Sequence, residues 1–581
     1  MNNVVLLVIF IVAAMILGLD IWSFPLISPD EPRYAETARE MIERMDFITP
    51  YCDYIPRFDK PVLFYWLETL SLQAFGLNEL AARLPSVLAG AGMVCLAFLL
   101  GNVQGFGLVA AGMMLTTLQI FVLSKIAITD MTLAFFISAV ICFFYLGYRE
   151  RQEIQQKFAL KEKQSSSWFI WMFVMMAFGM LCKGPVAILL PFIIIFIFLI
   201  LQKDIFDFIK DTWLELCIGL GLLVLISLPW YLAVHMATAG KFTYEFFMGH
   251  NLSRYLTVHT NHLGAIWYYI PVIIIGLFPW TFFLAQAFIS NDHSTKFNLR
   301  AESARAAHLM SFCSLWAIVI FVFFSFSQTK LPTYITPIYL PLIIIIAKWW
   351  SEKFKTTRSH GYKNIDGLIG LAVMALLVLI AGILGLFVFK NKLLEIGSAA
   401  VFASITIICF LFIAAALVSM TAMFDRARVA FMIILGTSLL SYLISTHFIM
   451  RPFAIHRDAG AKAFALSLKP QDKLACYQTH STIFSFYAQR PVLELDKAEL
   501  DKAELVKYLT DSNTNTIRYF VAKSRYLAEF DKYLINQTNG DSAVYEVIKK
   551  NKVYSYGKSL SEKLPDARHA KSEKAEFTRR K

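Results

Sequence analysis

The fold is decided by residues 4–36, which read VVLLVIFIVAAMILGLDIWSFPLISPDEPRYAE. Roughly twenty apolar residues come first, and that length lets a helix cross about 30 Å of hydrocarbon. The segment has neither the charged start nor the small-residue cleavage site of a removable signal peptide, so we expect a retained transmembrane helix. A dense charged motif, SPDEPRYAE at 28–36, follows at once, and a second, RFDKPV, stands at 57–62.

The composition extends this interpretation to the whole chain. Of the 581 residues 57% are hydrophobic and only 17% are charged, and the mean hydropathy is +0.57. These values are typical of a polytopic α-helical membrane protein rather than a soluble one. We interpret the net charge of +12 as contact with membrane lipids and anionic headgroups, and we expect no nucleic-acid partner.

Apolar runs of membrane-spanning length predict about thirteen transmembrane helices. The Lys183-Gly184-Pro185 break separates two of them, because lysine between apolar segments, glycine and proline all favour a helix end. The thirteen runs are 4–24, 80–102, 106–124, 131–148, 168–182, 184–202, 213–236, 264–289, 307–327, 334–350, 366–389, 398–422 and 428–449.

Lysine and arginine set the expected orientation. One set of connecting loops carries seventeen basic residues, and the short loops on the opposite side carry seven. The richer set is expected in the cytoplasm, which places the loop 25–79 and the region after residue 450 on the external face. In a bacterium this means a multi-pass protein of the inner membrane with its charged motifs in the periplasm.

The chain divides into a membrane domain and a smaller C-terminal domain. Residues 1–450 form the first, and their loop 25–79 is expected to carry interfacial helices over 31–44 and after Lys60-Pro61. Short mixed runs at 473–477, 490–495 and 518–522, with a helix near 502–509, predict a small soluble α/β domain over 451–560. The charged tail 561–581 is expected to be disordered.

Several motifs occur along the membrane domain: PDEPRYAE at 29–36, DKP at 59–61, KGP at 183–185, HNLSR at 250–254, WYYIPV at 267–272 and KLPTY at 330–334. Their order and spacing over residues 5–450 resemble those of a known family, the bacterial aminoarabinose transferases of lipid A. These are polyprenyl-phosphate-sugar glycosyltransferases of the GT-C fold, related to protein O-mannosyltransferases.

The resemblance implies a glycosyltransferase. It would move 4-amino-4-deoxy-L-arabinose, or a related amino sugar, from undecaprenyl phosphate to a phosphate of lipid A in the periplasmic leaflet. The product carries less negative charge, which would protect the cell against cationic antimicrobial peptides such as polymyxin.

We expect three acidic residues in the catalytic group. Asp30 is the principal carboxylate, expected to orient the substrates and to stabilise positive charge at the anomeric carbon. Glu31 follows it, and Asp130 is a second acid. Both aspartates have an ordinary alternative as helix N-caps.

Basic and aromatic residues at external helix ends are expected to bind substrate. Lysine offers a point charge and arginine a bidentate fork to phosphate, although snorkelling, membrane anchoring and aromatic-belt packing are the plain alternatives. The expected substrate-binding residues are Arg33, Tyr34, Lys60, Lys183, Arg254, Lys330 and Tyr334.

The resemblance also suggests a divalent metal site. Asp59 and His250 are candidate ligands of a divalent ion, but they come from separate loops, and Asp59 stands where the family commonly has Glu. The eight cysteines show no CxxC spacing, which predicts no disulfide framework and leaves a Cys52–Cys476 bridge open.

Two other functions remain open. A protein O-glycosyltransferase using the same kind of donor would need Asp30 as a true general base, because a serine or threonine hydroxyl must lose its proton to attack. A lipid transporter or flippase would place ionisable residues near the bilayer midplane on broken helices, whereas the charges here gather at one face.

Overall fold

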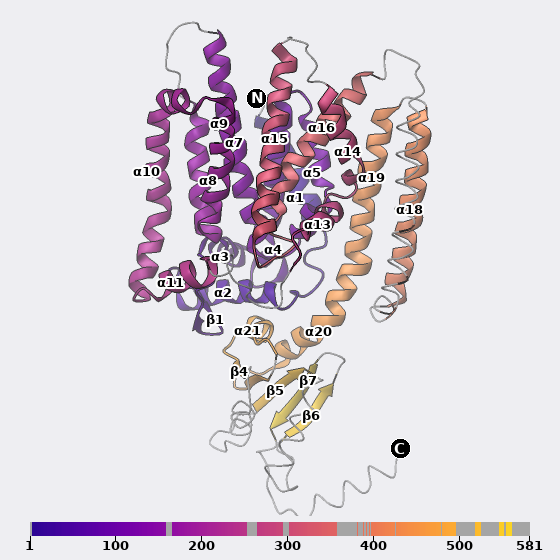
Figure 1. Ribbon diagram of the computed structural model, residues 1–581. Helices are drawn as coiled ribbons and strands as arrows, with labels where there is room; N and C mark the ends of the chain where they lie inside the picture. The colour runs from indigo at the N-terminus through magenta and orange to yellow at the C-terminus, as the bar shows by residue number, and fades with distance from the viewer. Residues whose placement is uncertain are drawn as a thin grey trace, which may run out of the picture. The chain divides into compact units, whose positions relative to one another are not determined.

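Apolar helices build the larger of two units into which the chain divides (Figure 1). The first unit comprises residues 1–24, 38–51 and 56–453, and the second comprises residues 25–37, 52–55 and 454–581. The computed structural model describes residues 3–157, 166–252, 264–293, 301–356, 380, 387, 391, 394, 397–423, 426–477, 479–495, 518–523, 545–550 and 554–559.

The helices of the first unit follow the apolar runs of the sequence. They are α1 (Asn3–Gly18), α3 (Leu63–Phe75), α4 (Glu79–Asn102), α5 (Gly107–Leu115), α6 (Leu118–Leu123), α7 (Thr129–Lys157), α8 (Ser167–Lys183), α9 (Val186–Gln202), α10 (Ile205–Ala237), α11 (Lys241–Tyr244), η1 (Glu245–Leu252), α13 (Tyr269–Gly276), η2 (Trp280–Phe283), α14 (Leu284–His293), α15 (Ala301–Phe326), η3 (Thr336–Ile338), α16 (Tyr339–Thr356), α18 (Ser398–Met423), α19 (Ala427–Ser445) and η4 (Thr446–Met450). Helices α2 (Asp30–Arg44) and α20 (Arg451–Ser467) each run from one unit into the other.

The chain is a multi-pass membrane protein by the length and composition of its helices. Within the described ranges, six helices are long and apolar enough to cross a membrane, or seven if the bent pair around Pro279 counts as one span. Helices α1, α8 and α9 are apolar but shorter. The run 366–389 lies almost wholly outside the described residues, so the expected thirteen crossings remain a prediction.

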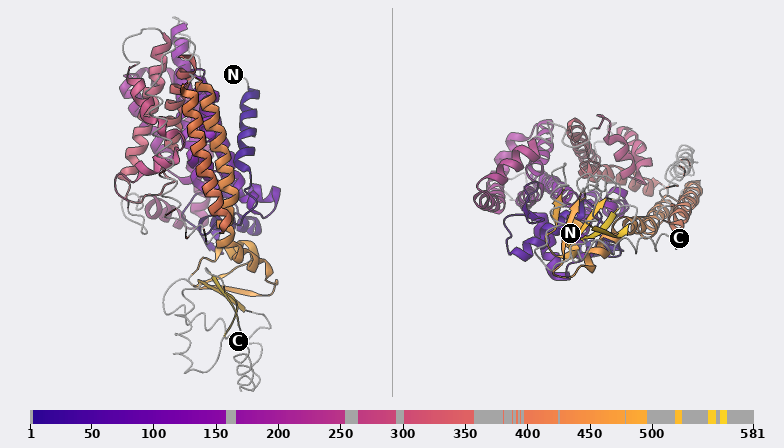
Figure 2. Two further views of the ribbon diagram at one scale, coloured as in Figure 1. Left: turned by 90° about the vertical axis from the view of Figure 1, so that its right-hand side faces the viewer. Right: turned by 90° about the horizontal axis from the view of Figure 1, so that it is seen from below.

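The helices pack as neighbours in space as well as in sequence. Helices α7, α8 and α9 lie side by side, and α18 packs along α19 (Figures 1 and 2). The predicted break between α8 and α9 is confirmed, because α8 ends at Lys183 and α9 begins at Val186. Gly184 between them has a φ of +92°, a backbone conformation that favours glycine.

Two runs expected as single crossings are instead broken. The run 106–124 divides into α5 and α6 at Thr116-Thr117, and the run 264–289 bends by 106° near Pro279. Each break supplies hydrogen-bond partners to the other. Trp280 Nε1 donates to the backbone carbonyl of Met113 at 3.0 Å, and the backbone N–H of Leu118 donates to the backbone carbonyl of Phe278 at 3.1 Å. In an apolar environment such pairing is what makes a broken helix tolerable.

Two buried cations hold the turn that follows α1. Lys125 Nζ donates to the carbonyls of Leu17 and Leu19 at 2.9 and 2.6 Å, and the Arg83 guanidinium donates to those of Ile21 and Phe24 at 2.6 and 3.0 Å. Lys125 and Arg83 are 1% and 0% exposed, respectively. The carbonyls at and beyond the end of α1, which helix geometry leaves unpaired, thus receive charged donors.

The second unit contains a five-stranded mixed sheet. Its strands β3 (Lys473–Tyr477), β4 (Leu493–Leu495), β5 (Arg518–Lys523), β6 (Tyr545–Lys550) and β7 (Tyr554–Ser559) are ordered β4-β3-β5-β7-β6. Strand β3 is parallel to β4 and β5, whereas β7 is antiparallel to β5 and β6. Ala475 pairs with Leu493 on one side and with Phe520 on the other.

Helices α20 and α21 (Thr482–Ala488) accompany this sheet in the sequence. The three strands expected at 473–477, 490–495 and 518–522 correspond to β3, β4 and β5, while the helix expected near 502–509 lies outside the described residues. The short strands β1 (Tyr51–Cys52) and β2 (Ile55–Pro56) form a separate two-stranded sheet. All eight cysteines are free, Cys52 and Cys476 among them.

Candidate active site

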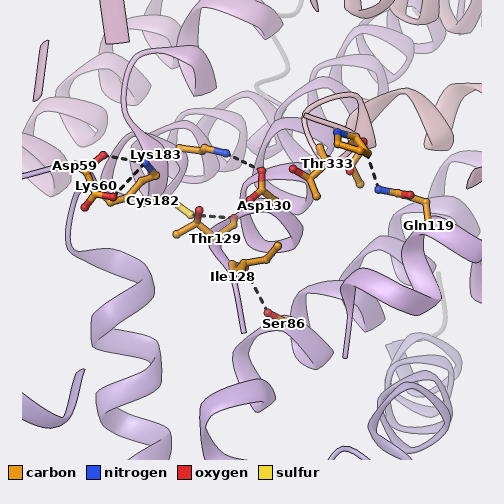
Figure 3. Close-up of polar contacts among 12 residues, drawn as sticks. Asp59, Lys60, Ser86, Gln119, Ile128, Thr129, Asp130, Cys182, Lys183 and Thr333 are labelled. Atoms are coloured by element: carbon orange, nitrogen blue, oxygen red, sulfur yellow. Dashed lines mark hydrogen bonds and ion pairs between the residues drawn. The ribbon is translucent and has the colours of Figure 1, made fainter. Parts of the chain in front are cut away.

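The first unit encloses a cavity of about 460 Å³ with one polar end and one apolar end. Charged side chains from the 59–60 loop, α7 and α8 form the polar end (Figure 3). The remaining wall is aliphatic and aromatic and comes from α7, α9, η1 and α15. Its members are Leu133, Ala134, Ile137, Val186, Leu189, Phe246, Phe247, Phe323 and Phe324.

An ion pair between Asp130 and Lys183 lies at the polar end. The carboxylate Oδ1 is 2.7 Å from the ammonium Nζ, and each side chain is only 14% exposed. Asp130 stands in the first turn of α7 and Lys183 is the last residue of α8. Each charge therefore has the sign that the dipole of its own helix favours.

The segment after α15 completes this end of the cavity. The Lys183 ammonium lies 4.7 Å from the centroid of the Tyr334 ring, which is a cation–π distance. Thr333 lines the cavity as well. The structure thus brings together Asp130, Lys183 and Tyr334, three residues that the sequence had placed only at separate helix ends.

Lys60 lines the same cavity beside Asp59 (Figure 3). Its Nζ donates to the backbone carbonyl of Asp59 at 2.9 Å and lies 3.7 Å from the Asp59 carboxylate. Arg57 binds both oxygens of that carboxylate, with Nε 2.6 Å from Oδ1 and Nη2 3.1 Å from Oδ2. This bidentate contact fixes the backbone from which Lys60 projects.

The environment of Asp59 does not suit a metal ion. Both carboxylate oxygens already face the Arg57 guanidinium, and a second cation, Lys60, is adjacent. Among the residues that the structure describes, no group of three or more His, Cys, Asp or Glu side chains could hold a metal. The side chain of His250 is outside the described set, so its role as a ligand stays a prediction.

Lys330 lies near the cavity wall rather than on it. Its Nζ donates to the carbonyl of Ser327 at 2.5 Å, and Ser327 is one of the lining residues. Lys330 is 7% exposed, and desolvation lowers the pKa of its ammonium group. Arg254, the other expected phosphate ligand from this part of the chain, lies outside the described residues.

The motif 28–36 belongs to the second unit. Asp30 is the first residue of α2 and is exposed, and Glu31 beside it is fully buried. The Glu31 carboxylate accepts the backbone N–H of Ile27 at 2.7 Å. Within the described ranges the Asp30 carboxylate makes no hydrogen bond or ion pair.

The two other expected residues of this motif are less exposed. Arg33 Nη2 lies 3.3 Å from His480 Nδ1, and the Arg33 carbonyl accepts from Cys52 Sγ at 3.8 Å. Tyr34 is 7% exposed. His480 carries no motif of its own in the sequence and was missed there.

Sequence reasoning also missed Arg57, Thr333 and the phenylalanine wall. Arg57 had a usable signal, because it stands two residues before Asp59 in a charged motif. Thr333 lay inside the KLPTY motif but has no charge to single it out. Phenylalanine is so common here, 51 residues in all, that no pattern marks the four that line the cavity.

Comparison with known proteins gives this cavity a family context. The model of the dolichyl-phosphate-mannose-protein mannosyltransferase family matches residues 3–244. The undecaprenyl phosphate-alpha-4-amino-4-deoxy-L-arabinose arabinosyl transferase of Yersinia pestis (strain Pestoides F) is 30% identical over 394 residues, which cover 67% of this chain and 66% of that protein's own length. The protein of the same description from Pectobacterium carotovorum is 30% identical over 387 residues, covering 66% and 65%.

Solved structures agree in fold. ArnT from Cupriavidus metallidurans bound to undecaprenyl phosphate superposes with a TM-score of 0.72 at 21% identity, covering 96% of this chain and 99% of that one. Its apo state gives a TM-score of 0.73 at 20% identity, covering 97% and 100%. The chain therefore has the GT-C fold of ArnT, and it is similar in sequence to the arabinosyl transferases over about two thirds of its length and somewhat less than two thirds of theirs.

Proposed function

We propose that the protein is a membrane glycosyltransferase that moves 4-amino-4-deoxy-L-arabinose from undecaprenyl phosphate to a phosphate of lipid A. The observation that carries the proposal is the cavity with Lys60, Lys183 and Asp130 at one end and an apolar wall over the rest. A polyprenyl phosphate has this same division into an anionic head and a long apolar chain. The relatives named above for such a transfer support the choice of sugar.

In this proposal the cations receive the donor's phosphate. Lys60 and Lys183 line the cavity, Lys330 lies behind Ser327, and Arg254 would add a bidentate contact. Charge-assisted contacts of this kind stabilise the phosphate as it leaves with the electron pair of the broken sugar–oxygen bond. Tyr334 would orient the sugar or phosphate beside Lys183.

The acidic residues would act on the acceptor and on the sugar. The lipid A phosphate is already ionised near neutral pH, so its oxygen can form the new bond to the anomeric carbon without giving up a proton. Asp30 would orient the acceptor or the donor's amine and stabilise the positive charge that develops at this carbon. Glu31, Asp130, Arg33 and Tyr34 complete the proposed site.

We place the reaction on the periplasmic face of the bacterial inner membrane. The proposal includes thirteen crossings in residues 1–450, an external loop 25–79, a periplasmic α/β domain over 451–560 and a basic tail over 561–581. The imbalance of basic residues between the two sets of loops supports this orientation. Transfer there would lower the surface negative charge and give resistance to polymyxin and other cationic peptides.

Transfer to a protein hydroxyl is the second candidate. The match of residues 3–244 to the protein mannosyltransferase model favours it. Proteoliposomes supplied with radiolabelled undecaprenyl-phosphate aminoarabinose, lipid A and an acceptor protein separate the two, because the label enters either the lipid or the protein fraction. Mass spectrometry of lipid A from cells with and without the gene identifies the added sugar.

Asp30→Asn tests the catalytic assignment. We expect it to abolish transfer and leave expression and folding near wild type. Asparagine caps helices about as well as aspartate, so a purely structural Asp30 would tolerate the change. Retained activity in this variant would make Asp30 a structural residue.

A further inference from the structure

The C-terminal part of the second unit holds the segment that carries Asp30. Three successive backbone N–H groups at the start of the motif, those of Leu26, Ile27 and Ser28, each have a side-chain acceptor. Two of these acceptors, Tyr487 and Asp458, lie more than 400 residues further along the chain. The third is Glu31 of the motif itself.

Two adjacent residues of α20 hydrogen-bond to both backbone groups of Ser28. Its N–H donates to Asp458 Oδ2 at 3.3 Å, and its carbonyl accepts from Arg457 Nη2. Asp458 is fully buried, and Arg457 Nε lies 3.6 Å from its Oδ2. A buried carboxylate is costly unless it is bonded, so this geometry is strongly preferred over a displaced one.

Helix α21 makes a second hydrogen bond to the same segment. The Tyr487 hydroxyl accepts the N–H of Leu26 at 2.9 Å, and Tyr487 is 8% exposed. The backbone is therefore held from two helices at Leu26 and Ser28, just before Asp30, whose side chain remains exposed.

A third contact ties the other external-loop segment of this unit to α21. The hydroxyls of Ser481 and Ser485 both donate to the Asp53 carboxylate. Asp53 has a φ of +53°, a backbone conformation uncommon for residues other than glycine, asparagine and aspartate. It stands four residues before Arg57, at the start of the second charged motif.

We propose that α20 and α21 form a positioning clamp for residues 26–31, the segment that carries Asp30. Asp458, Arg457 and Tyr487 are its positioning residues, and they act through the backbone of Leu26 and Ser28. The inference rests on the proposed role of Asp30. It gives the C-terminal domain a part in the reaction, since a carboxylate must be held to within a fraction of an ångström to stabilise a transition state. None of these three residues lines the cavity described above, so we expect the clamp to act on turnover rather than on donor binding.

Two variants loosen the clamp to different degrees. Tyr487→Phe removes one acceptor with little change in shape, and Asp458→Ala removes the carboxylate. We expect kcat to fall by about tenfold to a hundredfold, the range for displacement of a reacting group by about 1 Å, with the KM for undecaprenyl-phosphate aminoarabinose within about twofold of wild type. Asp458→Asn should recover part of the activity, because its amide oxygen still accepts from Ser28.

Amide hydrogen exchange supplies a readout that does not depend on activity. In Asp458→Ala the peptides covering residues 26–31 should exchange faster than in the wild type. Two matched controls should leave both exchange and kcat unchanged. Ser467→Ala lies on α20, where the hydroxyl donates to the Phe464 carbonyl of its own helix, and Tyr519→Phe alters a phenol that packs on Phe464.

The outcomes separate the clamp from the proposed function. Wild-type kcat in Tyr487→Phe and Asp458→Ala, alongside an inactive Asp30→Asn, overturns the clamp and leaves the function standing. A loss of kcat with unchanged exchange at 26–31, or with an equal loss in the controls, also overturns it. An active Asp30→Asn removes the catalytic role of Asp30, and the clamp falls with it.

Discussion

Asp130→Asn is expected to damage transfer by uncoupling Lys183 from its only ion-pair partner in the described chain. The substitution keeps the shape of the side chain and removes its charge. At an effective dielectric constant of about 20, two unit charges at the observed separation attract by about 6 kcal/mol. Desolvation of the two buried ions offsets much of this attraction, so we expect a net coupling of about 1–3 kcal/mol.

A double-mutant cycle measures that coupling. Asp130→Asn, Lys183→Met and the double variant are compared by kcat/KM for transfer from a labelled undecaprenyl-phosphate donor in proteoliposomes. If the pair acts as a unit, the double variant should be no worse than the poorer single variant. A coupling of about 1–3 kcal/mol corresponds to roughly a 5- to 150-fold departure from additivity.

A second ion pair provides the control. Arg151 Nη1 lies 2.6 Å from Asp204 Oδ2, and neither residue lines the cavity. Arg151→Met should lower the apparent Tm and leave kcat/KM near wild type. Additive effects of Asp130→Asn and Lys183→Met, within about 0.5 kcal/mol, would refute the view that the two side chains act together.

Three further expectations follow from the same structure. Lys60→Ala should weaken donor binding by roughly tenfold to a hundredfold, whereas Lys241→Ala, which removes an exposed lysine outside the cavity, should not; equal effects in titrations with the donor would mean nonspecific electrostatics. Burial lowers the pKa of Lys125 from 10.5 to about 8. Between these pH values the unfolded chain binds more protons than the folded protein, so the folded state gains stability as the pH rises. The Tm of the wild type, compared with that of Lys125→Met, should therefore increase from about pH 8 toward 10.5. In a cysteine-free background, Ile55→Cys and Asp207→Cys, both at exposed positions, should react with an impermeant thiol reagent from opposite sides of the membrane, and labelling from one side would contradict the orientation.

The sequence alone predicts those helix ends and strands that depend on residues close together in the chain. The break at Lys183-Gly184-Pro185 was predicted because a lysine, a glycine and a proline each act within a turn of helix. The strands β3 to β5 were predicted for the same reason, from short runs with their own periodicity. The break at Thr116-Thr117 was not, because its partners Trp280 and Phe278 lie some 160 residues away.

The candidate site shows the same limit. Asp130, Lys183 and Tyr334 were each selected by charge or motif, but nothing in the sequence joins Asp130 to Lys183, 53 residues away. Asp458 and Tyr487 were not selected at all, since a single acid on α20 and a single tyrosine on α21 carry no pattern. Their contacts with the 26–28 backbone depend on tertiary structure alone.

The cation-held turn after α1 has a consequence for how the chain is made. Leu17 leaves the ribosome 108 residues before Lys125, the donor that its carbonyl receives in the folded protein. Until then, the carbonyls at this end of the first helix must be solvated by water or headgroups, because hydrocarbon offers them no donor. Helix α1 therefore reaches its final position only after several later segments have been synthesised. Its insertion into the bilayer and its docking against those segments are separate events in time.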